Sequence, residues 1–144
     1  MGCDIHMHAE VKIQGEWRYY GQIDLNRNYA MFTYLAGVRP GRAGEDDFEP
    51  ISEPRGLPED ATFMTQYHAN EIWGFDGHSH SWINADEIIE YEAFLDRKGW
   101  LYPKGGFSPI TGYLFGNNWG GFKKYPEDYP DDLEDIRFVF WFDN

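Results

Sequence analysis

The segment C-D-I-H-M-H-A-E-V-K-I (residues 3–13) alternates polar and apolar side chains along its whole length. A period of two is typical of a β-strand that buries one face and turns the other away from the core. The turn sequence Q-G-E follows, and W-R-Y-Y-G-Q-I-D-L (17–25) predicts a second strand. We therefore expect the chain to begin with a β-hairpin.

The last ten residues, D-I-R-F-V-F-W-F-D-N (135–144), carry apolar side chains on both faces. This pattern is typical of a central strand, which is buried on both sides. If this strand lies antiparallel to the first one, Asp143 comes close to residues 2–4.

Three segments between the hairpin and the last strand are predicted to form helices. They are 27–38 with Asn26 as a cap, about 59–72 after Pro58, and a helix that begins with the capping box Asn84/Glu87 and ends near 98–99. The Gly- and Pro-rich stretches predict a loop (39–58) and ordered loops or short strands (99–134). The predicted fold class is α+β, an antiparallel or mixed sheet packed with about three helices.

The chain has 144 residues, and we expect one domain over 1–144. Its formal net charge of -13 disfavours duplex nucleic acid and anionic membranes as partners. No apolar run approaches the roughly 20 residues of a membrane span, and no segment resembles a signal peptide. The lone cysteine, Cys3, fits a reducing compartment. We expect a cytoplasmic protein. The sequence is compatible with a homo-oligomer and does not fix the oligomeric state.

The polar face of the first strand carries the pattern D-x-H-x-H, formed by Asp4, His6 and His8. Alternate side chains of a strand point the same way, about 7 Å apart, so both imidazoles could ligate one ion. Asp4 would be a further ligand or would orient an imidazole. The alternative is an exposed polar strand face without a site, because the alternation continues through residues 10–12.

The same triplet recurs in D-G-H-S-H (76–80), so four of the five histidines lie in two matching patterns. If the two segments meet, they supply ligands for one or two Zn²⁺ or Mn²⁺ ions. In a metal-free site, one histidine would act as general base and another as general acid on a phosphodiester. A capped turn whose histidines bond to the backbone is the alternative. The predicted metal ligands are Asp4, His6, His8, Asp76, His78 and His80, and the predicted catalytic residues are His78, His80, His6 and Asp4.

Arginines are concentrated early in the chain, and no lysine occurs between Lys12 and Lys98. Arginine suits a site that grips phosphate or carboxylate with a planar fork. The segment P-I-S-E-P-R-G-L-P (50–58) predicts a rigid loop that presents polar side chains to an anion or a nucleobase edge. The alternative for the arginines is that they are scattered on the surface, and the alternative for 50–58 is an ordered surface loop whose Glu53 and Arg55 pair locally. The predicted ligand-binding residues are Arg27, Arg39, Glu53, Arg55, Ser81 and Trp82, with Trp82 stacked on a base.

Five motifs together resemble the "MGCDIH" family, small proteins of tailed bacteriophages and prophages. The motifs are M-G-C-D-I-H (1–6), R-N-Y (27–29), P-I-S-E-P-R-G-L-P (50–58), D-G-H-S-H-S-W (76–82) and F-W-F-D-N (140–144). The likeness covers nearly the whole chain. It implies a phage-encoded protein in the cytoplasm of the bacterial host, and it implies no particular reaction. By analogy with other small phage proteins, it suggests a role against host defence.

These patterns predict a phage-encoded hydrolase, a metal-dependent phosphodiesterase that acts on a small cyclic nucleotide or another phosphorylated ligand. A non-enzymatic protein that sequesters the same class of ligand is the first alternative. The second alternative is an acidic protein that inhibits a host protein or mimics nucleic acid. It rests on the net charge of -13 and on the acidic run P-E-D-Y-P-D-D-L-E-D (126–135).

Overall fold

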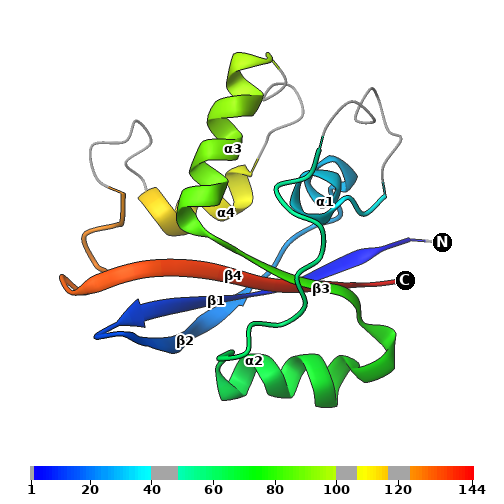
Figure 1. Ribbon diagram of the computed structural model, residues 1–144, viewed down its shortest axis with the longest axis horizontal. Helices are drawn as coiled ribbons and strands as arrows, with labels where there is room; N and C mark the ends of the chain where they lie inside the picture. Colours follow the sequence, from blue (N-terminus) through cyan, green and yellow to red (C-terminus); the bar gives the residue numbers. More distant parts are fainter. Residues whose placement is uncertain (1, 40–48, 100–106, 117–123) are drawn as a thin grey trace.

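The computed structural model describes residues 2–39, 49–99, 107–116 and 124–144, and it confirms the predicted α+β class. Four antiparallel strands form one sheet in the order β2-β1-β4-β3 (Figure 1). The elements are β1 (Asp4–Ile13), β2 (Glu16–Ile23), α1 (Tyr29–Ala36), α2 (Phe63–Tyr67), the π-helix η2 (His68–Trp73), the 3₁₀ turn η3 (Gly74–Asp76), β3 (His78–Asn84), α3 (Ala85–Arg97), α4 (Ser108–Phe115) and β4 (Leu133–Asp143).

The N-terminal hairpin forms as predicted, because a two-residue turn joins β1 directly to β2. Gln14 and Gly15 both have positive φ angles, 53° and 77°. Two central residues with positive φ give a type I′ turn, whose twist matches that of the flanking strands. Glycine takes such angles without strain, and Gln14 is one of the three non-glycine residues with a positive φ in the part of the chain described here.

The C-terminal strand β4 is central, as predicted, because it lies between β1 and β3. It pairs antiparallel with β1 over almost their whole lengths, and Asp143 lies opposite Asp4. This register confirms the expected approach of Asp143 to the beginning of the chain. It also alternates the side chains of both strands between two faces of the sheet.

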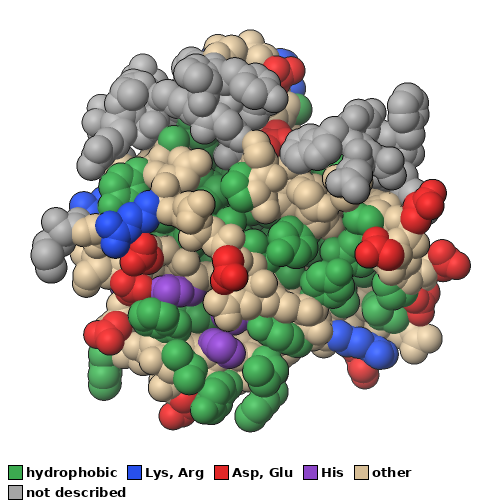
Figure 2. Space-filling model, turned by 180° about the vertical axis from the view of Figure 1, so that it is seen from behind, with side chains coloured by type: hydrophobic (Ala, Val, Ile, Leu, Met, Phe, Trp, Pro, Cys, Tyr) green, Lys and Arg blue, Asp and Glu red, His purple; other side chains and the backbone are tan. Residues whose placement is uncertain are grey.

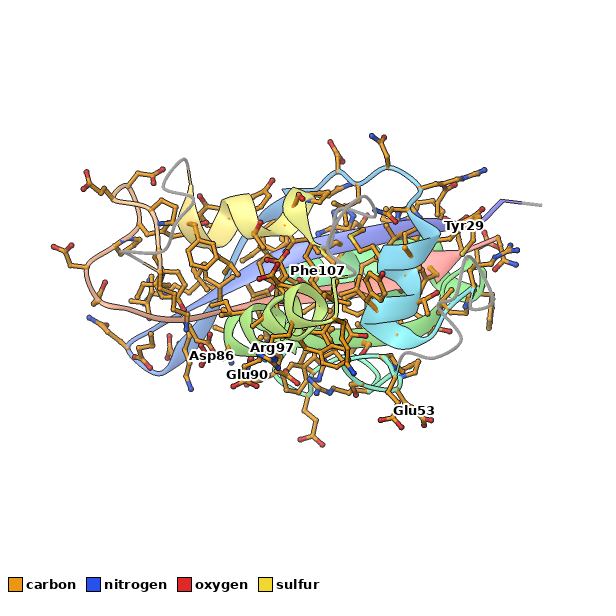
Figure 3. All side chains as sticks on the ribbon, turned by 90° about the horizontal axis from the view of Figure 1, so that it is seen from above. Tyr29, Glu53, Asp86, Glu90, Arg97 and Phe107 are labelled. Carbon is orange, nitrogen blue, oxygen red and sulfur yellow. The ribbon has the colours of Figure 1, made fainter. Side chains whose placement is uncertain are left out.

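One face of the sheet holds the main hydrophobic core, under α1, α3 and α4 (Figures 1 and 3). Its side chains are almost wholly excluded from water, and burial of each large apolar side chain contributes about 1.5–3 kcal/mol. The residues that fill it include Met7, Phe32, Leu35, Ile88, Leu95, Ile110, Leu114, Phe138, Phe140 and Phe142.

The opposite face is covered by α2 and η2 (Figure 1), so an exposed polar strand is the wrong interpretation of most of β1. His8 is 1% exposed and Glu10 is 0% exposed. Glu10 accepts hydrogen bonds from the backbone N–H of Thr62 and the hydroxyl of Thr65, both at 2.8 Å. It also accepts one at 2.7 Å from Arg137 on the adjacent strand. The polar face of β1 is therefore an interior surface.

The helices differ in detail from the prediction. The first helix is capped by Asn28, whose side chain accepts from the backbone N–H of Met31, and not by Asn26. The helix predicted over 59–72 begins later, at Phe63, and continues as a π-helix. The capping box of Asn84 and Glu87 is present. Within the predicted loops or short strands of 99–134, residues 108–115 instead form α4, since Pro suits the first turn of a helix. Residues 124–132 contain no helix or strand, and residues 100–106 and 117–123 lie outside the described part of the chain.

No helix among the described residues is both long enough and apolar enough to cross a membrane.

The buried carboxylate gives a test of the fold. We predict that Glu10→Gln lowers the free energy of unfolding by about 3 kcal/mol, because the variant leaves the buried guanidinium of Arg137 with less compensating charge. The matched control, Lys124→Gln, removes a surface ion pair with Asp86 and should cost about 1 kcal/mol or less. Urea denaturation of both variants makes the comparison, and equal losses would contradict the structural role of Glu10.

Candidate functional site

Histidine side chains gather around Trp141 on the face of the sheet that α2 and η2 cover. The ring centroids of His6, His8 and His80 lie 6.4, 5.2 and 5.7 Å from that of Trp141. His68, the first residue of η2, lies 4.8 Å from His8. The two predicted histidine segments therefore do meet, but only His80 of the second segment takes part.

A β-bulge in β3 explains why His78 does not join them. The pairing of β3 with β4 shifts by one residue between His78 and Ser81, and Ser79 has a φ of 55°. The bulge breaks the simple alternation of side chains. His78 packs beside Phe142 on the main-core face and donates through Nε2 to the Asn144 side-chain oxygen at 2.5 Å. His6 and His78 thus lie on opposite faces of the sheet.

The six predicted metal ligands do not converge on one point. Asp76 is exposed in η3, and His78 lies on the far face from His6 and His8. Among the residues that the structure describes, no group of three or more His, Cys, Asp or Glu side chains is arranged to hold a metal ion. Metal ligation by this set stays a prediction that the geometry does not support.

His8 is buried and neutral. A hydrogen bond of 2.8 Å joins its Nδ1 to the hydroxyl of Tyr19, and its ring stacks on Trp141. Burial and the nearby imidazoles of His68 and His6 lower the pKa of His8 to about 4. Burial also lowers the pKa of His80. His8 has no access to an external ligand, so its role is to support the histidine face.

His6 lies at the accessible end of this face, in a pocket of about 400 Å³ that we call the His6 pocket. Its Nε2 donates to the carboxylate of Asp143. Its ring stacks on that of Trp73 in η2, with the two ring centroids 3.7 Å apart. A carboxylate on one ring nitrogen fixes the imidazole and leaves the other nitrogen as the base. Asp4 and Asp24 also line the pocket. The arrangement is suited to proton transfer.

A second pocket, of about 660 Å³, lies at the other end of the same face, and we call it the tryptophan pocket. Trp17 of β2 and Trp82 of β3 belong to its wall. The Arg137 guanidinium carbon lies 4.1 Å from the Trp17 ring centroid, and that of Arg55 lies 4.7 Å from the Trp82 ring centroid. Cation–π contacts of this kind hold the indoles in place. Two predicted ligand-binding residues, Arg55 and Trp82, therefore share one pocket.

The arginines predicted to bind phosphate are engaged within the protein. Arg55 donates to both carboxylate oxygens of Glu87, at 2.8 and 2.5 Å, and also to Ser52 and the backbone of Trp82. Arg27 donates to Asp4 at 2.7 and 3.2 Å, and this pair lowers the pKa of Asp4. Both arginines are therefore paired within the protein, with carboxylates that lie 23 and 32 residues away in the sequence.

The other three predicted ligand-binding residues lie apart from both pockets. The guanidinium of Arg39 lies 5.5 Å from the ring centroid of Tyr29. Ser81 is buried and accepts from the backbone N–H of Arg55 at 3.0 Å. Glu53 is exposed and points outward at the edge of the molecule (Figure 3). Their assignment to a ligand stays a prediction.

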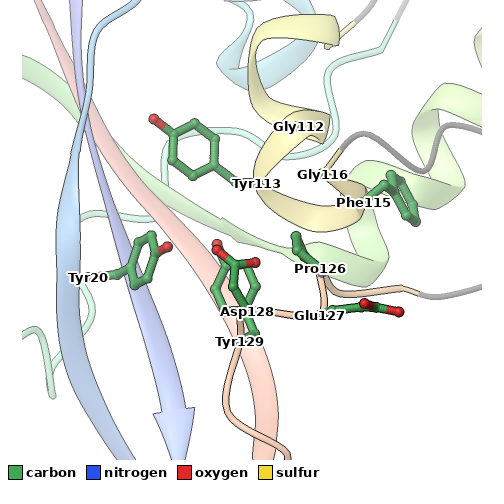
Figure 4. A pocket seen from close by; sticks show the side chains of 9 residues that line it. All are labelled: Tyr20, Gly112, Tyr113, Phe115, Gly116, Pro126, Glu127, Asp128 and Tyr129. Atoms are coloured by element: carbon green, nitrogen blue, oxygen red, sulfur yellow. The ribbon is translucent and has the colours of Figure 1, made fainter.

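A further pocket, of about 580 Å³, lies between β2, α4 and the segment 126–129 (Figure 4). Tyr20, Tyr113 and Tyr129 are among the side chains that line it, beside the carboxylates of Glu127 and Asp128. None of the predicted site residues belongs to it.

The residues of these sites that were not predicted from the sequence include Trp17, Trp73, Arg137 and Trp141. The alternation in the last strand offered a signal for Arg137 and Trp141, because both share a face with Asp143. Trp17 and Trp73 gave no such signal, since their positions depend on the register of β2 and on the π-helix.

No family model matches the chain, and neither a curated protein nor a solved structure matches it.

The buried imidazole gives a pH test. Folded His8 stays neutral down to about pH 4, whereas the unfolded chain takes up this proton near pH 6.5. Stability is therefore lost as the pH falls through this window, by up to about 3 kcal/mol. We predict that His8→Gln loses less stability between pH 7 and pH 4.5, as measured by urea denaturation. An unchanged pH profile in the variant would refute the assignment to His8.

Proposed function

We propose that the protein binds a nucleobase, as part of a nucleoside or nucleotide, in the tryptophan pocket. The observation that carries this proposal is the pair of indoles, Trp17 and Trp82, on opposite edge strands of one pocket. Three strand spacings, about 14 Å, separate the two strands, so the two indoles lie on opposite sides of the pocket and a base can stack on either of them. The volume of about 660 Å³ falls in the range of small-molecule sites. Base stacking on aromatic rings supplies the affinity.

Polar groups in the same pocket suit the edge of a base. Asn84 and Asp135 line it, and burial raises the pKa of Asp135. The Asn84 oxygen already accepts from the backbone N–H of Glu87, which holds this amide in one orientation. An amide and a carboxylate together recognise the donor and acceptor pattern of a base that carries an exocyclic amino group. Adenine, guanine and cytosine have this feature.

The charges of the pocket disfavour a phosphate inside it. Its carboxylates include those of Glu59, Asp60 and Asp135, and its two arginines are already paired with carboxylates. A phosphate brought between them would meet net negative charge. In this proposal the base enters the pocket, and any phosphate stays at its mouth.

The biological role follows from the resemblance to phage proteins. A phage-encoded protein that binds a nucleotide without changing it would sequester a signal of host defence. Such a protein needs stacking and edge recognition but no catalytic group, which fits the residues of the tryptophan pocket.

The test is a titration with adenosine, guanosine and cytidine, and with the matching monophosphates and cyclic nucleotides, followed by calorimetry. We expect binding of at least one base, with no gain from added phosphate. Trp82→Ala and Trp17→Ala should each weaken it by about 1–3 kcal/mol, which is roughly tenfold to a hundredfold in Kd. Tyr113→Leu, which removes an aromatic side chain from the pocket in Figure 4, is the control. Equal binding by Trp82→Ala and the unaltered protein would reject the proposal.

A hydrolase that uses the His6 pocket is the second candidate, and the His6–Asp143 pair is the observation that favours it. His6 would act as the general base that activates water, and Asp143 would orient its ring. Asp4 and His6 are two of the four predicted catalytic residues, and both line this pocket. The nearby carboxylates of Asp4 and Asp24 favour a neutral or cationic reacting group over a phosphate.

Cyclic nucleotides and uncharged esters are the substrates to compare. If the protein turns over either class, His6→Gln should lower kcat by about 10²–10⁴-fold, and Asp143→Asn should lower it as well. Arg18→Gln, at an exposed position of β2, is the control. Recovery of every compound unaltered after heat release would exclude the hydrolase and leave the binding protein.

A further inference from the structure

Large apolar side chains are exposed along one short segment of the chain, from Phe63 to Asp76. Six large hydrophobic residues are exposed in the part of the chain that the structure describes, and five of them lie in this segment. Figure 2 shows hydrophobic side chains along the lower edge of the molecule, where α2 lies in Figure 1. We call this surface the apolar ridge. It consists of Phe63 (77% exposed), Met64 (40%), Tyr67 (43%), Ile72 (53%) and Phe75 (108%).

The helical geometry aligns part of the ridge. Phe63 and Tyr67 are four residues apart on α2, and their rings stack with centroids 6.2 Å apart. Ile72 follows Tyr67 by five residues, which in an α-helix would place it on another side. A π-helix has hydrogen bonds between residues i and i+5, so its turns are wider than those of an α-helix. Ile72 therefore lies closer to the side of Tyr67. The π-helix thus extends the apolar surface in one direction.

The inner side of the same segment is firmly held. Thr65 is buried and donates to Glu10, and Ala69 is 1% exposed. Trp73 stacks on His6, and the Gln66 side chain donates to the backbone oxygen of Ala61 at 2.6 Å. The ridge is therefore a fixed surface, and a partner would not have to order it. Contiguous exposed apolar surface of this kind marks interaction sites.

Charge decides which partner fits. The ridge segment 63–76 carries two carboxylates, Glu71 and Asp76, and neither lysine nor arginine. A second copy of the chain would bring another net charge of -13 against these two carboxylates and against a chain that is itself acidic. An anionic membrane is disfavoured for the same reason, since membrane-surface helices carry Lys and Arg beside their apolar face. A basic protein surface is complementary.

We propose that the apolar ridge binds a basic amphipathic segment of a partner protein, one with an apolar face flanked by Lys and Arg. Phe63 and Phe75 would insert into the apolar face of the partner as the main anchors. Carboxylates of the same segment, such as Glu71 and Asp76, would pair with the flanking cations and speed association. This surface is separate from both pockets, so the inference does not depend on the proposed ligand.

The experiment uses two helical peptides with the same leucines at the i, i+3, i+4, i+7 spacing, one flanked by lysines and the other by glutamates. Fluorescence anisotropy measures their binding to the full chain. We expect the lysine peptide to bind, with an affinity that falls as ionic strength rises from about 0.05 M to about 0.5 M. The glutamate peptide should not bind. Phe63→Ser combined with Phe75→Ser should weaken binding by about tenfold or more.

Tyr20→Ser is the matched control. Of the six exposed large hydrophobic residues in the described part of the chain, Tyr20 is the one that lies outside the ridge. Circular dichroism and thermal unfolding verify that each variant is folded. Equal binding of both peptides would overturn the proposal, as would lysine-peptide binding that survives the double substitution. Sedimentation equilibrium tests the second copy: a dimer that Phe63→Ser abolishes would replace the basic partner as the occupant of the ridge.

Discussion

A single buried carboxylate, that of Glu10, determines how the two sides of this fold are held together. It is fully excluded from water, so its charge must be compensated by donors within the protein. Arg137 on β4 supplies one donor, and Thr62 and Thr65 at the start of α2 supply two more. Arg137 in turn donates to Asp60 at 2.8 Å. One charged group therefore joins β1, β4 and the segment that covers the second face of the sheet.

The consequence is a sheet with two interiors of different chemistry. The main core is apolar and supplies most of the favourable burial. The other interior is thin, and it consists of imidazoles and indoles with the Glu10 network beside them. Within the described residues, the indole N–H of Trp141 is buried without a hydrogen-bond partner. A buried donor without an acceptor costs free energy, so this interior contributes less to stability than the apolar core.

The two pockets lie at opposite ends of this second interior, and α2 and η2 cover the part between them. The His6 pocket has a base oriented by a carboxylate, whereas the tryptophan pocket has aromatic walls, paired arginines and net negative charge. The same covering segment presents the apolar ridge to solvent. Its inner contacts with Glu10 and His6 and its outer apolar side chains therefore belong to one element, which relates the candidate ligand sites to the candidate partner surface.

Local pattern was enough to predict the hairpin, the central last strand and the capping box of Asn84 and Glu87. Those features depend on neighbours in the sequence, on side-chain alternation and on turn chemistry. Even the approach of Asp143 to Asp4 followed, because antiparallel pairing of two long strands leaves few registers. The helix α4 was missed because its sequence, with Pro109 and Gly112, has a weak helical pattern.

The candidate site could be predicted only in part, because its chemistry depends on distant partners. The sequence by itself determined that histidines and carboxylates share a face of β1, through the alternation of residues 3–13. Only the tertiary structure decided that His8 and Glu10 are buried, that Arg27 and Arg55 are neutralised by Asp4 and Glu87, and that His78 and His80 separate. The physical reason is that burial, ion pairing and a one-residue bulge arise where segments far apart in the chain meet, and no local period encodes those contacts.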